Sequence, residues 1–136
     1  MGDKDTFQGY PPEYGQEFLR EAVAKHYENF GVEIDSSEVF ISDGAKSDSG
    51  NIVDILGDNT IVIPDPVYPV YFDTNVMSGR KIELLPSNID NSFSPMPSDL
   101  KTQGEPCVIY LCSPNNPTGA VYDADQLKTW VDYALE

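Results

Sequence analysis

The chain is poor in positive charge. Its 136 residues include eight Lys and Arg against 23 Asp and Glu, which gives a formal net charge of −15 at pH 7. A field of that sign repels nucleic-acid phosphates and anionic lipid headgroups, so we expect neither nucleic acid nor a membrane surface as a partner. The hydrophobic share of 40% argues against a disordered chain, and the length suits one compact domain.

Cysteine and histidine are scarce as well. Cys107 and Cys112 stand on one expected strand with opposite parity, so their side chains point to opposite faces and no disulfide is expected. Reduced cysteines fit the cytoplasm. His26 is the single histidine and is expected to be a solvated residue of a helix. With no Cys pair or carboxylate cluster at ligand spacing, we expect no metal site.

Several familiar signatures are missing. No apolar run has membrane-spanning length and residues 1–5 do not resemble a signal peptide, so the expected location is the cytoplasm. Neither Gly-x-Gly-x-x-Gly nor Gly-x-x-x-x-Gly-Lys-Ser/Thr occurs, which weakens a nucleotide-binding loop of those types. No Gly-x-Ser-x-Gly is present either, so triad hydrolase chemistry has no support.

Apolar spacing predicts helices that alternate with strands. Helices are expected over residues 18–30 with Gly31 as the stop, over 47–56, weakly over 70–77, and after Asp123, where Gln126 completes a capping box. The second helix should turn Ile52, Val53 and Leu56 inward. The last should turn Leu127, Trp130, Val131 and Ala134 inward.

Short apolar runs predict four strands, at residues 39–41, 60–63, 82–85 and 107–111. The last is the most apolar and is expected at the centre of the sheet. Strands that alternate with helices predict the α/β class: three layers, with a mainly parallel sheet and helices on both faces. Residues 88–97 are predicted to form a polar connection that runs close to a pocket.

Three predicted strands end in loops that suit a ligand, because the carboxyl ends of parallel strands open at one edge of the sheet. The loop 43–46 brings Lys46 to a helix start, where an anion could bind; from the loop alone, a plain turn with a solvated lysine is the favoured alternative. Prolines flank Tyr68 and stiffen a possible stacking surface for a planar ring; an ordinary packed tyrosine is the alternative. The loop 113–119 offers amides and hydroxyls to a ligand. The alternative is a proline-rich turn whose polar groups hydrogen-bond only to one another.

Together these loops resemble fold-type I pyridoxal-phosphate (PLP) aminotransferases, and most nearly the LL-diaminopimelate aminotransferase group. The resemblance spans nearly the whole chain. It is carried by the following stretches: Gly9-Tyr10-Pro11-Pro12-Glu13-Tyr14-Gly15 with Leu19-Arg20-Glu21-Ala22, Ser42-Asp43-Gly44-Ala45-Lys46-Ser47-Asp48, Asp65-Pro66-Val67-Tyr68-Pro69-Val70-Tyr71 and Ser113-Pro114-Asn115-Asn116-Pro117-Thr118-Gly119-Ala120.

The resemblance implies a role for each matching residue. Ala45 and Lys46 would hold the phosphate of PLP, Tyr68 would stack on its ring, and Asn116 would bond the ring's 3′-oxygen. Tyr10 and Glu13 match a loop that reaches toward the substrate of the neighbouring subunit in a homodimer. The substrates implied are LL-diaminopimelate and 2-oxoglutarate, as in lysine biosynthesis.

The family's catalytic groups have no match here. In the family, the Ser-x-x-Lys lysine that tethers the cofactor as a Schiff base lies further along the chain than the Asn-Pro-Thr-Gly loop. That spacing occurs here only at Lys81 and Lys101, which both precede the loop, and Arg20 and Arg80 lie outside the family's arginine motif. We therefore interpret residues 1–136 as part of the cofactor-binding (large) domain, without its C-terminal half and the small domain. This segment alone is predicted to be inactive. The alternatives are an aminotransferase of other specificity, such as aspartate, and a non-catalytic doubly wound binding module.

Overall fold

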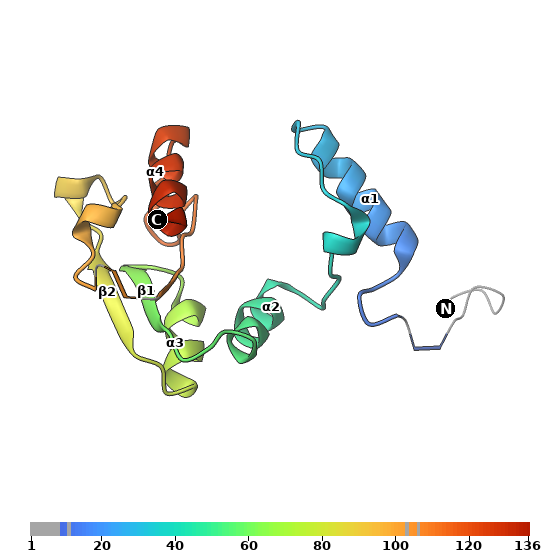
Figure 1. Cartoon of the computed structure of the whole chain (residues 1–136), viewed down its shortest axis with the longest axis horizontal. Coiled ribbons are helices and arrows are strands. Elements are labelled where there is room, and N and C mark those ends of the chain that lie inside the picture. Colours follow the sequence, from blue (N-terminus) through green and yellow to red (C-terminus); the bar gives the residue numbers. More distant parts are fainter. Residues whose placement is uncertain (1–8, 11, 103, 106) are drawn as a thin grey trace. The chain divides into compact units, whose positions relative to one another are not determined.

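The computed structural model describes residues 9–10, 12–102, 104–105 and 107–136. The chain divides into two compact units, Met1–Ser47 and Asp48–Glu136, and each is described by itself (Figure 1). Pro11, part of the Gly9–Gly15 motif, and residues 1–8 at the amino terminus lie outside the described residues. No helix among the described residues is long and apolar enough to cross a membrane.

The second unit is built on a parallel three-stranded sheet. Its strands are β1 (Thr60–Asp65), β2 (Ile82–Pro86) and β3 (Cys107–Ile109), in the order β2-β1-β3. The prediction that the strand at 107–111 is central was therefore wrong, since β1 takes that place. Residues 60–64 of β1 are all buried, as expected for a strand paired on both sides and covered on both faces, whereas β3 is only half-buried.

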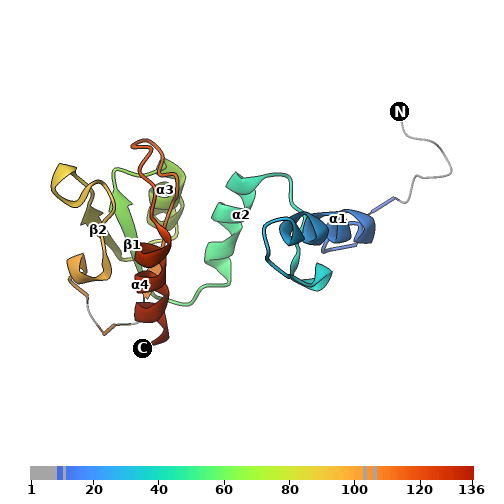
Figure 2. The ribbon, with the colours of Figure 1, turned by 90° about the horizontal axis from the view of Figure 1, so that it is seen from above.

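Helices cover both faces of this sheet, which confirms the predicted three-layer α/β arrangement. Helices α3 (Pro69–Met77) and α4 (Ala124–Leu135) lie on opposite sides of the strands (Figures 1 and 2). Val62 shares a core cluster with Trp130 of α4. Side chains alternate along a strand, so Ile61 and Ile63 point to the α3 face, and both are fully buried.

The predicted start of α4 is confirmed in detail. Gln126 N donates to Asp123 Oδ1 at 2.8 Å, and Asp123 N donates to Gln126 Oε1 at 2.9 Å, which forms the capping box. The predicted inward face holds only for Trp130, because Leu127 is 40% exposed and Val131 is 56% exposed. Ala134 is exposed too. Helix α4 thus buries only a narrow face, and it contacts the 3₁₀ turn η4 (Pro97–Asp99).

Helix α2 (Ala45–Asn51) begins two residues before the predicted start at Ser47. It tightens into the 3₁₀ turn η2 (Ile52–Asp54). Val53 is buried as predicted and Leu56 is half-buried, whereas Ile52 is 46% exposed. The guanidinium of Arg80 donates to the carbonyls of Val53, Leu56 and Gly57 and so fastens this segment to the end of α3.

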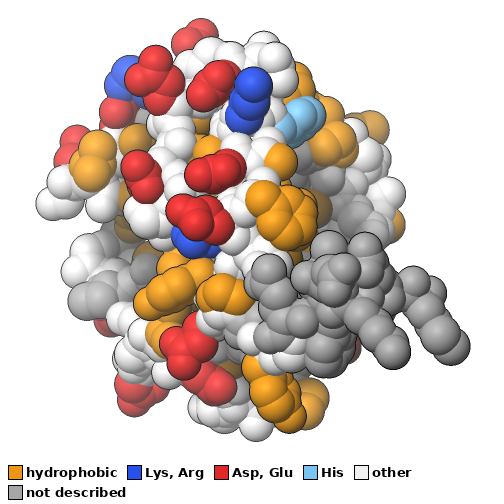
Figure 3. Space-filling model, turned by 90° about the vertical axis from the view of Figure 1, so that its right-hand side faces the viewer, with side chains coloured by type: hydrophobic (Ala, Val, Ile, Leu, Met, Phe, Trp, Pro, Cys, Tyr) orange, Lys and Arg blue, Asp and Glu red, His pale blue; other side chains and the backbone are white. Residues whose placement is uncertain are grey.

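The first unit contains α1 (Glu17–Glu28) and the 3₁₀ turn η1 (Ser36–Glu38), joined by a bond of 2.9 Å from Arg20 Nη1 to Ser36 O. The helix ends two residues before the predicted end, and Gly31, at φ +72°, lies in the turn that follows. No residue of α1 is buried: Phe18 in the helix is 72% exposed, and Phe30, two residues beyond its end, is 70% exposed. A space-filling view shows hydrophobic and acidic side chains side by side at the surface (Figure 3).

The strand predicted at residues 39–41 does not form. Val39 is buried but Phe40 is 66% exposed, and Ile41 N donates to Tyr14 O at 3.1 Å. This backbone pairs once with the loop before α1 instead of with a strand. The close approach requires Gly15, since a Cβ there would lie 2.6 Å from Cβ of Ile41.

Candidate functional site

The strands β1 and β3 end in two loops that a buried amide joins. Because the strands are parallel neighbours, the loops 65–71 and 113–119 leave the sheet at the same edge. Asn115 is 7% exposed, and its Nδ2 donates to Pro66 O at 3.0 Å and to Thr118 Oγ1 at 2.9 Å. One side chain therefore ties the two loops together across the edge of the sheet.

Backbone bonds hold the shape of the loop 113–119. Asn115 N donates to Ala120 O, and Gly119 N donates to Asn115 O, both at 2.7 Å. Gly119 has φ +74°, a conformation that glycine adopts without strain. Asn116 is exposed between these anchored residues. Cis peptide bonds precede Pro66, Pro114 and Pro117.

Three tyrosine rings line the α3 side of this edge. Tyr68 is half-buried at the N-cap of α3, and Pro69 begins the helix behind it. The ring of Tyr71 meets Tyr68 edge-on at 5.7 Å and lies 5.0 Å from the ring of Tyr110 on the β3 side. Burial raises the pKa of Tyr71, and the neighbouring Cys112 raises it further, so this phenol is neutral at pH 7.

The remaining predicted site residues belong to the first unit. Ala45 and Lys46 form the first turn of α2 and are exposed. Tyr10 and Glu13 are exposed in the loop before α1, where Gly15 N donates to Pro12 O at 2.9 Å. Tyr68 and Asn116 are the predicted site residues of the second unit, Asp48–Glu136. The structure places their loops at the same edge of the sheet.

Two residues that support the predicted site residues were not identified from the sequence. Asn115 was quoted only as part of a motif, although it is the buried member of the Asn115-Asn116 pair. Tyr71 was likewise not distinguished from Tyr68. A signal was available for both: a second amide or aromatic next to a proposed ligand contact, in a loop that prolines stiffen, is a candidate for supporting that contact.

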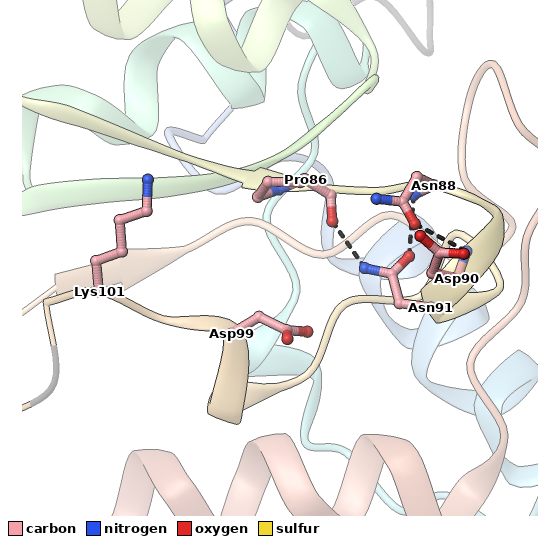
Figure 4. Close-up of a pocket in the computed structure, with 6 residues that line it drawn as sticks. All are labelled: Pro86, Asn88, Asp90, Asn91, Asp99 and Lys101. Carbon is pink, nitrogen blue, oxygen red and sulfur yellow. Dashed lines mark hydrogen bonds between the residues drawn. The ribbon is translucent and has the colours of Figure 1, made fainter.

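The predicted pocket beside the connection 88–97 is present. A cavity of about 440 Å³ opens at the end of β2 (Figure 4). Its lining residues are Pro86, Asn88, Asp90, Asn91, Asp99 and Lys101. Asn91 Nδ2 donates to Pro86 O at 2.7 Å, and Asn88 Oδ1 accepts from Asp90 N at 2.8 Å, so local bonds occupy these amides.

The cysteines are unpaired and lie on opposite faces, as predicted. Cys107 packs against the core cluster of Trp130, whereas Cys112 lies against Tyr71. Among the described residues, no three His, Cys, Asp or Glu side chains are grouped to hold a metal ion. Both arginines bond to backbone carbonyls within their own units, so each has a structural role there.

The second unit has a parallel sheet with helices on both faces, and the loops after its neighbouring strands β1 and β3 are joined by the Asn115 amide. This is the open α/β architecture, a class of proteins whose ligands bind at the carboxyl ends of the strands. The chain belongs to the aminotransferase class I and II family, whose model matches residues 1–136.

Two curated relatives are LL-diaminopimelate aminotransferases. The protein from Azobacteroides pseudotrichonymphae is 56% identical over 137 residues, which cover 99% of this chain and 33% of the relative. The protein from Lachnospira eligens is 49% identical over 149 residues, which cover 98% and 36%. A solved L,L-diaminopimelate aminotransferase from Chlamydomonas reinhardtii matches with a TM-score of 0.82 at 39% identity, over 96% of this chain and 35% of that one. The chain spans about a third of the length of these relatives.

Proposed function

We propose that residues 1–136 form part of the cofactor-binding domain of a PLP-dependent aminotransferase. Membership of the aminotransferase family supports the class of reaction. The observation that carries the proposal is the bond between Asn115 and Pro66, which holds the Tyr68 and Asn116 loops at one edge of the sheet. The family match favours this function over a doubly wound nucleotide-binding module.

The chemistry of the side chains fits PLP, which has a planar pyridine ring, a 3′-oxygen and a phosphate. Tyr68 would stack on the ring, and the amide of Asn116 would donate to the 3′-oxygen. Ala45 and Lys46 would hold the phosphate, and Lys46 would supply positive charge in a chain of net charge −15. When bound, PLP supplies an electron sink for reactions at the α-carbon of an amino acid.

The tyrosines beside the proposed ring position would keep it dry and free of added charge. Tyr71 supports the edge of Tyr68 and packs on Tyr110, so the Tyr68 ring has little freedom to turn. Burial raises the pKa of Tyr71, which therefore adds no negative charge near an anionic cofactor. These residues would orient the ring and exclude water from one of its faces.

The whole protein would move an amino group from an amino acid to a 2-oxo acid. The printed names of the relatives favour LL-diaminopimelate, with 2-oxoglutarate as the proposed acceptor and lysine biosynthesis as the setting; an aspartate-like specificity is the alternative. Tyr10 and Glu13 would face the substrate of the second subunit in a homodimer, and the proposed location is the cytoplasm.

No catalytic residue is proposed within these 136 residues. Of the six lysines, only Lys81 and Lys101 have the Ser-x-x-Lys spacing, and both precede the Asn116 loop, whereas the Schiff-base lysine expected from the resemblance follows it. The purified chain is therefore expected to catalyse no transamination of LL-diaminopimelate with 2-oxoglutarate. Incubation with PLP, borohydride reduction and peptide mapping should yield no single lysine modified stoichiometrically. One such lysine would contradict this part of the proposal.

Absorbance titration of the purified chain with PLP tests the cofactor site. We expect saturable binding that Tyr68→Ala and Asn116→Ala each weaken by about fivefold, since a stacking contact or a hydrogen bond contributes about 1 kcal/mol. Asn91→Ala, which removes a similar amide bond to Pro86 O beside β2, is the matched control and should bind as the wild type does. Equal affinity of all four proteins would contradict the proposed site.

A further inference from the structure

We propose that Asn115 is a positioning residue that fixes Asn116 relative to Tyr68 in the cofactor site. The inference rests on the proposed function, because it concerns how that site is held in shape. Asn115 is buried and adjoins the exposed Asn116 directly in the chain, so any displacement of Asn115 is passed on through one peptide unit.

Every donor of Asn115 is engaged. Its two side-chain bonds go to Pro66 O in the loop after β1 and to Thr118 Oγ1 in its own loop. Its backbone N donates to Ala120 O, and its backbone O accepts from Gly119 N. The side chain thus couples the loop that carries Asn116 to a carbonyl two positions before Tyr68. This coupling sets the distance between the two proposed ring contacts.

The acceptor of the same amide is unused. Asn115 Oδ1 is buried and has no hydrogen-bond partner in the structure. Burying an amide oxygen without a hydrogen-bond donor lowers the free energy of unfolding. Stability alone therefore does not explain an asparagine at this position. What this position requires is therefore the pair of N–H donors, which no apolar side chain of the same shape can supply.

The test uses pyridoxamine 5′-phosphate, because it lacks the aldehyde that reacts with lysines. A donor at the 3′-oxygen stabilises its ionised form and lowers the pH midpoint at which the bound 3-hydroxyl ionises, which absorbance reports. Asn116→Ala should raise that midpoint. Asn115→Leu, which keeps the shape and adds no charge, should raise it as well and weaken binding about fivefold, the loss expected for a hydrogen bond.

The matched control is Asn91→Leu, because Asn91 also donates an amide N–H to a proline carbonyl, Pro86 O, but in the loop after β2. It should leave both the midpoint and the affinity unchanged, whatever it does to stability. Because Asn115 acts through Asn116, the double variant Asn115→Leu/Asn116→Ala should bind no more weakly than Asn116→Ala alone. Additive losses in that double variant would overturn the inference.

Two failures can be told apart. If the wild type binds the ligand and Asn116→Ala shifts the midpoint, but Asn115→Leu does not, the positioning role is overturned and the proposed function stands. If the wild type does not bind, or Asn116→Ala changes nothing, the proposed function itself fails. Should Asn115→Leu not fold, Thr118→Val decides, since it removes one of the two acceptors of Asn115; an unchanged midpoint there counts against the inference.

Discussion

Asn115 donates from its side chain to the carbonyl of Pro66, 49 positions earlier in the chain, over 3.0 Å. The two residues follow neighbouring parallel strands, so this bond closes the edge of the sheet at which ligands of open α/β proteins bind. An amide that is buried there, and not solvated, places the exposed Asn116 and the half-buried Tyr68 on a fixed frame.

Glu83 should make stability depend on acid pH. Burial of its carboxylate by itself raises the pKa, but hydrogen bonds from the Thr102 side chain and from the backbone N–H groups of Lys101 and Thr102 outweigh it, so the pKa is lowered overall. The resulting stability is present above the ordinary glutamate pKa of 4.5 and is lost as pH falls through the lowered folded value. Urea unfolding from neutral to acid pH measures this loss.

Glu83→Gln is the matched variant for that titration, because it removes the ionisation and keeps the size of the side chain. Its free energy of unfolding should be lower than that of the wild type at neutral pH, and the difference should shrink in acid. A constant difference at all pH values would show that the charge of Glu83 contributes nothing to stability.

Tyr122→Phe should destabilise the second unit by about 1–2 kcal/mol, because the buried carbonyl of Pro95 loses its donor. In the wild type Tyr122 Oη donates to Pro95 O at 2.9 Å. Burial raises the pKa of Tyr122 to about 12, from an ordinary 10.0. Its contribution is therefore complete below pH 10.0 and is lost as pH rises through about 12. Chemical unfolding checks the first statement and ultraviolet titration of the phenol the second; normal ionisation near 10.0 would contradict it.

Arg80→Ala should cost about 2 kcal/mol, since hydrogen bonds from a charged donor to backbone carbonyls are stronger than neutral ones. The guanidinium serves three carbonyls after α2, including Leu56 O at 2.7 Å. Arg80→Lys should restore only a part, because an ammonium lacks the planar fork. The free energies of unfolding of the three proteins give the comparison, and full rescue by lysine would refute the role of the fork.

Gly15→Ala should destabilise the first unit by about 2 kcal/mol or more. Gly15 has φ +94°, and an added Cβ would overlap the side chain of Ile41 at 2.6 Å. Gly31→Ala is the control: its φ is +72° but no atom lies within 4 Å of the added Cβ, so only the conformational cost of about 1 kcal/mol is expected. Hydrogen exchange of amides in α1 measures both variants, and equal effects would show that the overlap with Ile41 is relieved.

Local sequence patterns predicted the elements whose causes are local. The capping box of Asp123 and Gln126 determined where α4 begins, because both bonds lie within four residues. The strand at Thr60 was predicted from its continuous apolar run, which a strand covered on both faces requires. Opposite faces for Cys107 and Cys112 followed from the two-residue period of a strand alone.

Elements that depend on distant partners could not be predicted in this way. The run Val39-Phe40-Ile41 is apolar enough for a strand, but its backbone pairs with Tyr14 and no strand lies beside it among the described residues. The more apolar strand at Cys107 is placed beside β1 and not at the centre, because pairing order depends on crossovers and not on hydrophobicity. The exposed flanks of α1 and α4 likewise show that periodicity identifies an apolar face without saying what covers it.

The candidate site, too, was predictable from the sequence only in part. The sequence by itself determined which chemical groups the chain offers: a proline-flanked tyrosine, adjacent amides and a lysine at a helix start. Only the tertiary structure decided which amide is buried as a tie and which is exposed, and that Tyr71 supports Tyr68. The physical reason is that a hydrogen bond or ring contact across 49 positions depends on how two parallel strands are paired, and that pairing leaves no mark on the residues between them.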